Sequence, residues 1–147
     1  MAVKRSRVNM QGPDSRNIGG LKEHNVPAAF CDAVRIELPD HVQLHISGQT
    51  PVDDDGNLVG DNMKDQPRHV LARIKRIFEH EGGTMADIVR FRVYCTDISP
   101  DVLRQVHEAR NEVFGADQRP ASTLVQISGI IREGAMIEID ADAVIDR

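Results

Sequence analysis

The chain has few of the residues that recognise nucleic acids or build metal and disulfide frameworks. Its 147 residues include no Trp, one Tyr and 3% aromatic residues in all, so a platform on which single-stranded bases stack is not expected. A formal charge of −5 argues against a nucleic-acid partner, because such proteins normally carry a basic patch. The two cysteines, Cys31 and Cys95, lie far apart in the sequence. We expect both to be reduced thiols packed in strands, and no metal site.

Long apolar runs are missing as well. No stretch approaches the roughly 18 apolar residues that cross a membrane, and the basic start MAVKRSRVNMQG lacks the apolar segment of a secretory signal. We therefore expect a cytoplasmic protein without a membrane partner. Residues 1–24 are polar and without apolar periodicity, so we expect a flexible N-terminal arm followed by a single domain over 25–147.

The domain alternates between strand and helix patterns. Two apolar segments separated by Pro-Asp-His predict a hairpin, and Asp55-Gly56 predicts a turn between short extended pieces. The segment around that turn lacks the acids that begin and end a calcium loop. Apolar residues at helical spacing predict two helices, the first capped by Asp65 and the second starting at Ser99-Pro100. The expected strands are 30–38, 42–48, 87–97, 121–128 and 135–145, and the expected helices are 65–83 and 99–115.

The order β-β-(β)-α-β-α-β-β predicts an α+β fold in which two helices cover one face of a mixed sheet. The other face must then meet water or another subunit. Alternation predicts two sets of side chains under the helices: Val89, Phe91, Val93 and Cys95, then Ile137, Ile139, Ala141 and Ala143. Glu138, Asp140 and Asp142 fall opposite, where we expect a charge ladder with Arg90 and Arg92.

Four segments, together with the order of the elements, resemble one known family. They are ISGQTPVDDDGNLVGD, DQPRHVLARIKRIFEHEGGTMADIVRFRVYCTD, PAST and GAMIEIDADAV, and the resemblance covers roughly residues 27–145. The chain is similar to the reactive-intermediate deaminase (Rid) family, also called YjgF-like and labelled endoribonuclease L-PSP. The resemblance implies a chorismate-mutase-like α+β fold, a homotrimer with three clefts between subunits, and no metal or organic cofactor. Active members hydrolyse imines and enamines derived from amino acids, releasing ammonia and a keto acid.

The family signature Pro-Ala-Arg-Ser corresponds to residues 120–123, so Ser122 stands where the family has the Arg that grips the substrate carboxylate. The resemblance gives Glu138 the role of orienting the attacking water, although it could equally be one rung of the charge ladder. Arg119 is a weak replacement for the missing guanidinium, because alternation on an extended segment points it away from Ser122. The remaining pocket positions implied by the resemblance are Phe30, Ser47, His107, Thr123 and Leu124.

Three functions stay open. The first is a small-molecule hydrolase or deaminase in an intersubunit cleft, acting on something other than the usual carboxylate-bearing imine. The second is a non-catalytic ligand-binding or regulatory trimer that kept the cleft. The third is the ribonuclease or translation inhibitor of the family's other label, which the acidic charge and scarce aromatic residues disfavour.

Overall fold

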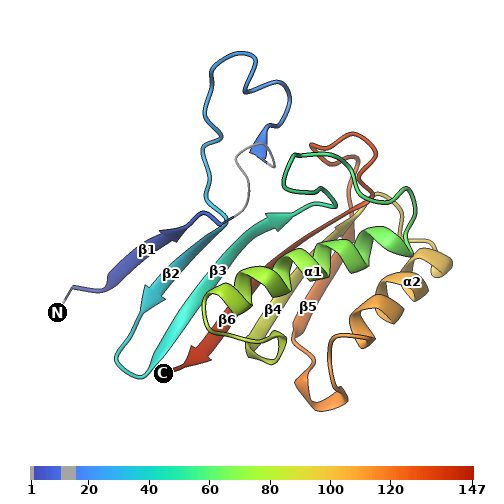
Figure 1. Cartoon of the computed structure of the whole chain (residues 1–147). Helices are drawn as coiled ribbons and strands as arrows, with labels where there is room; N and C mark the ends of the chain where they lie inside the picture. The colour runs from blue at the N-terminus through green and yellow to red at the C-terminus, as the bar shows by residue number, and fades with distance from the viewer. Residues whose placement is uncertain (1, 11–15) are drawn as a thin grey trace.

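The computed structural model, which describes residues 2–10 and 16–147, contains one six-stranded sheet with two helices over one face (Figure 1). The strand order is β1-β2-β3-β6-β4-β5. All neighbours are antiparallel except β4 and β5. The elements are β1 Lys4–Val8, β2 Ala33–Glu37, β3 His41–Gln49, α1 Asp65–His80, η2 Met85–Asp87, β4 Ile88–Cys95, α2 Pro100–Asn111, η3 Ala116–Gln118, β5 Ala121–Gln126 and β6 Ile137–Asp146. The predicted mixed α+β sheet with two helices is confirmed.

The core lies between the sheet and the helices. Strand β6 alternates strictly, with Ile137, Ile139, Ala141 and Ala143 at 0–2% exposure. Helix α1 supplies one apolar stripe to the same layer, in which Ile74, Ile77 and Phe78 are fully buried. Because apolar burial contributes roughly 25 cal/mol per Å², this layer is a large source of stabilisation for the fold. No helix in the described part of the chain has the length and apolar character to cross a membrane.

The N-terminal region differs from the expected arm. Residues Lys4–Val8 form the edge strand β1, which pairs with β2 from Lys4 opposite Glu37 to Val8 opposite Ala33. The open edge of β2 offers unpaired backbone groups to any extended segment. An edge strand needs little apolar sequence, and Val8 is the only buried residue of β1. Residues 1 and 11–15 of the expected arm lie outside the described residues.

Several local expectations also need correction. Asp65 does not cap α1, since the Asn62 side chain accepts the backbone N–H groups of Lys64 and Asp65. The extended pieces around Gly56 reduce to one isolated bridge, Val52 with Leu58. Both cysteines are free, as expected, but Cys31 precedes β2 rather than lying in a strand. Cys95 does lie in β4, where burial raises the pKa of its thiol to about 11.

The faces of β4 follow the predicted alternation except at its start. A bulge between Ile88 and Arg90 shifts the register, so Ile88 is buried and Val89 is 48% exposed. The predicted charge ladder forms around Arg92, which pairs with Asp140 at 2.5 Å and Asp142 at 3.0 Å. Arg90 takes no part in it and donates instead to Thr123 of β5 at 2.8 Å.

Truncating Phe91 tests the assigned faces of β4. Phe91 is fully buried, so Phe91→Ala is expected to lower the free energy of unfolding by about 3–5 kcal/mol. The matched control Val89→Ala, on the exposed side of the bulge, is expected to change it by less than about 0.5 kcal/mol. Urea denaturation measures both. Equal shifts of the two midpoints would contradict the bulge.

Candidate active site

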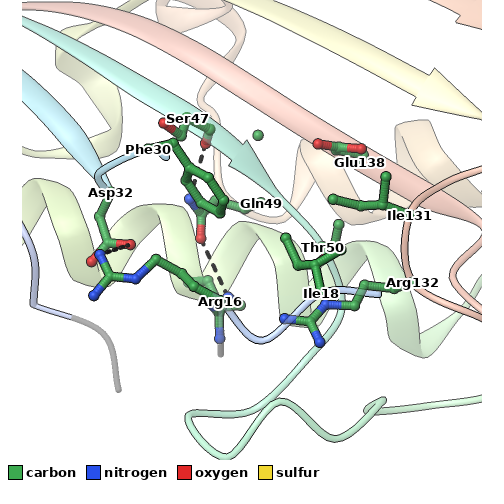
Figure 2. A pocket seen from close by; sticks show the side chains of 12 residues that line it. Arg16, Ile18, Phe30, Asp32, Ser47, Gln49, Thr50, Ile131, Arg132 and Glu138 are labelled. Atoms are coloured by element: carbon green, nitrogen blue, oxygen red, sulfur yellow. Dashed lines mark hydrogen bonds and ion pairs between the residues drawn. The ribbon is translucent and has the colours of Figure 1, made fainter. Parts of the chain in front are cut away.

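The predicted site residues fall into two cavities. The first cavity has a volume of about 240 Å³, and Phe30, Ser47, Gly48, Arg132 and Glu138 contribute to its wall. Figure 2 shows the Glu138 carboxylate beside Ile131 and Thr50, with Phe30 and Ser47 farther along the same cavity. The structure therefore brings three predicted site residues together: Phe30, Ser47 and Glu138.

Glu138 is an acid in the wall of the first cavity, and its pKa is shifted by its surroundings. It lies on β6 opposite Tyr94 of β4, and its side chain is half-buried. Desolvation, with a smaller contribution from the negative charge of Asp140, raises the pKa of the Glu138 carboxyl above its ordinary value. A carboxyl whose pKa moves toward neutrality exchanges protons more readily with a bound water at physiological pH.

Gly48 provides the space in which the Glu138 carboxyl lies. A Cβ atom at position 48 would overlap Glu138 Oε1 and come within 3.0 Å of its Cδ. The close approach occurs where the β3–β6 register is interrupted between Ile46 and Gln49. The irregular end of β3 thus allows a carboxyl on the neighbouring strand to lie directly against the backbone.

Ser47 has mainly a positioning role. Its hydroxyl donates to the Cys31 carbonyl at 2.7 Å, and its backbone N–H donates to the Asp32 carbonyl at 3.0 Å. These two bonds fix the segment that carries Phe30, which stands 43% exposed at the cavity wall. The hydroxyl proton is thereby used within the chain, and only the oxygen lone pairs remain for a ligand.

The N-terminal segment also contributes to the first cavity, which the sequence pattern did not reveal. Arg16 and Ile18 lie in its wall, and Arg132 donates to the Asn17 carbonyl at 2.8 Å. Arg16 also lies 4.0 Å from the buried carboxylate of Asp32. These positions are distant in sequence and carry no periodic signal, so only the folded chain shows their proximity.

The second cavity has a volume of about 560 Å³ and lies between α2 and the start of β5. It gathers four predicted residues, His107, Arg119, Ser122 and Leu124. The expectation that Arg119 points away from Ser122 was wrong, because Arg119 follows η3 and precedes β5, outside the alternating segment. Thr123, in contrast, is turned away, and its hydroxyl accepts a hydrogen bond from Arg90.

Ser122 and Glu138 lie on opposite faces of the sheet. Ser122 pairs in register with Phe91, which is buried under the helices. Glu138 pairs with Tyr94, three residues farther along β4 and hence on the other face. The two positions that the family resemblance joins in one site therefore do not meet within a single chain.

The described residues contain no group of three or more His, Cys, Asp or Glu side chains arranged to hold a metal ion. His41 and His45, which share a strand face, each bind a neighbouring carboxylate instead, Asp40 at 2.6 Å and Asp142 at 2.7 Å. Both histidines are thus explained by local contacts.

Replacing Gly48 tests the packing under Glu138. Gly48→Ala is expected to lower the free energy of unfolding by about 1–3 kcal/mol, as overpacking does, because its methyl group meets the Glu138 carboxyl. Gly129→Ala is the control, since nothing lies within 4 Å of a Cβ atom there. In the double variant Gly48→Ala/Glu138→Ala the loss should be relieved. Additive losses in chemical denaturation would contradict the contact.

The family model described as Endoribonuclease L-PSP matches residues 23–145. A RutC family protein of Pyrococcus horikoshii is 36% identical over 101 residues, which cover 68% of this chain and 77% of the relative. A YjgF/YER057c/UK114 family structure from Mycobacterium tuberculosis is similar with a TM-score of 0.72 and 31% identity, covering 97% of this chain and all of that one. A structure of the conserved Rid family from Yersinia pestis reaches a TM-score of 0.74 at 27% identity, covering 95% and 98% of the two chains. The chain belongs to the YjgF/Rid family, the family of the endoribonuclease L-PSP model.

Proposed function

We propose that the protein hydrolyses the C=N bond of an imine, or of the imine tautomer of an enamine, in a cleft between subunits. The observation that carries this proposal is the Glu138 carboxyl, which is half-buried in a cavity and has a raised pKa. A carboxyl with a perturbed pKa in a cavity is a candidate general acid–base group. Family membership supports a deaminase-like small-molecule protein at the coarse level.

The chemistry requires one water and one proton carrier. Ionised Glu138 accepts a proton from water while the water oxygen adds to the imine carbon. Glu138 returns that proton to the nitrogen, which gives a carbinolamine. The carboxylate then accepts the proton of the new hydroxyl group and passes it to the nitrogen as the C–N bond breaks, so that ammonia leaves and the carbonyl forms. A single carboxyl that alternates between base and acid completes this cycle.

The cleft is proposed to need a second copy of the chain. Proteins of this family are commonly homo-oligomeric, and a trimer would place the first cavity of one copy against the second cavity of its neighbour. Strand β5 supports this arrangement, because it is a sheet edge on which five of six residues are exposed, Val125 at 42%. An exposed edge strand with apolar side chains is a typical self-association surface.

Ammonia release tests the proposal. Imines with and without a carboxylate would be generated in situ, the former by enzymatic dehydration of serine, and ammonia would be followed against the spontaneous rate. Wild type is expected to accelerate release from at least one imine, and Glu138→Gln to lower the rate by about 100-fold or more, in line with loss of a general base. Because the base must be ionised, the rate should rise with pH through the raised pKa of Glu138.

The alternatives give different outcomes in the same preparation. A protein that binds small ligands but accelerates no imine hydrolysis would be the non-catalytic trimer, and Glu138→Gln would then leave every measured rate at the spontaneous value. Salt-sensitive RNA binding with cleavage would favour the nuclease label. Lys75→Gln, at an exposed ion pair with Glu79 on α1, is a control that should change neither rate nor binding.

A further inference from the structure

Arg110 is a buried cation without an anionic partner among the described residues of its own chain. It lies in the last turn of α2 and is only 8% exposed. Its guanidinium carbon lies 5.5 Å from the centroid of the buried Phe91 ring, and Phe91 in turn packs edge-to-face against Phe114. Among the described residues, the guanidinium donates no hydrogen bond and forms no ion pair.

A second buried arginine, Arg73, has the hydrogen-bond acceptors that Arg110 lacks among the described residues. Arg73 is equally shielded at 7% exposure, but it donates to the Gln49 side chain and the Val52 carbonyl. Removing a guanidinium from water without an acceptor costs free energy, and burial alone lowers the pKa of Arg110. A cation–π contact with Phe91 offsets only part of such a cost.

Arg110 contributes to the wall of the second cavity, and the charge of that wall is positive. Arg119 is a second guanidinium there, Ser122 provides a hydroxyl, and no acidic side chain lines the cavity among the described residues. Glu108 and Glu112, the acids two residues to either side of Arg110, lie outside the cavity wall and pair with Arg104 and Arg68. The donors and the positive charge of this wall match the acceptor groups of an anion.

We propose that Arg110, a residue of helix α2, is the group that binds the carboxylate of a small organic anion in the second cavity. This inference rests on the proposed function and deepens it. The guanidinium is thus supplied by helix α2 instead of by strand β5, where Ser122 stands. A planar guanidinium pairs with a carboxylate through two parallel hydrogen bonds, which fixes orientation as well as charge.

A guanidinium at position 110 also gives a reason for the small residue at position 122. A second guanidinium there would lie in the same cavity as Arg110 and Arg119, where like charges repel and each must be desolvated. Serine leaves room for the ligand carboxylate and offers one further donor. Arg110 therefore determines which ligands the cavity accepts, and Ser122 leaves the space that such a ligand needs.

Calorimetry on the full-length protein tests this role with pyruvate as the probe and pyruvamide as its neutral analogue. Wild type is expected to bind pyruvate more tightly than pyruvamide. Arg110→Gln should weaken pyruvate binding about tenfold or more and leave pyruvamide unchanged, because only the charged contact is lost. The control is Arg104→Gln, an exposed arginine of the same helix that pairs with Asp101 and Glu108, and it should bind both probes like wild type.

Thermal unfolding separates ligand binding from a structural role. Ligand-free Arg110→Met should melt no lower than wild type, because an unpaired buried charge is removed, while the stabilisation by pyruvate disappears. A lower melting temperature with no pyruvate effect on wild type would overturn the inference. Loss of self-association in Arg110→Gln without any change in pyruvate affinity would also overturn it, since the partner of Arg110 would then be a carboxylate of a neighbouring subunit.

The two proposals fail in different ways. If wild type binds pyruvate through Arg110 but releases no ammonia from any imine, the proposed reaction is wrong and the anion site stands. If ammonia is released while Arg110→Gln leaves pyruvate affinity and KM unchanged, the reaction stands and this inference is wrong.

Discussion

Strand β6 runs between β3 and β4, and its alternating side chains connect the core to the candidate site. One set, from Ile137 to Ala143, is buried against the helices, and the other set, from Glu138 to Asp142, lines the opposite face. The period of two leaves no freedom between the sets, because slipping the strand by one residue would bury the acids and expose the core. Hydrophobic packing of the first set therefore fixes the position of the Glu138 carboxyl.

Two ionisable side chains of opposite charge are partly removed from water, one on each face of the sheet. Glu138 is half-buried on one face and Arg110 is buried on the other. Since the folded-state pKa of Glu138 is raised, the folded chain holds the proton more tightly than the unfolded chain. The free energy of unfolding consequently falls as the pH rises from the usual carboxyl range through the raised value. A loss of stability on ionisation is typical of a residue that serves chemistry rather than stability.

The sequence predicted the parts of the fold that depend on local pattern. The helices, the hairpin and the faces of β6 follow from periodicity, and Arg92 does pair with Asp140 and Asp142. The exceptions arise where a bulge or pairing with a distant strand decides the structure, because neither is visible in the local sequence pattern. Val89 is exposed by a bulge, and Lys4–Val8 joins an edge that needs almost no apolar residues.

The site was predictable only in part for the same reason. Glu138, Ser122 and His107 were singled out by the family resemblance, whereas Arg119 reaches the cavity because it lies outside the strand. Arg110 was missed, although its sequence signal exists: it continues the apolar stripe of α2 at the four-residue spacing of Val102 and Val106. A cation on the apolar face of an amphipathic helix indicates either a buried partner or a ligand.

In the proposed oligomer one site takes Glu138 from one chain and Arg110 from its neighbour, and mixed oligomers of two variants, each impaired at substrate concentrations below KM, test this arrangement most directly. Glu138→Gln and Arg110→Gln chains would be unfolded together, refolded in equal amounts and assayed for ammonia release. Random mixing should restore wild-type pairing in about a quarter of the clefts, because each cleft draws one residue from each of two chains. Activity that stays at the level of the separate variants, although the chains have mixed, would contradict a shared site.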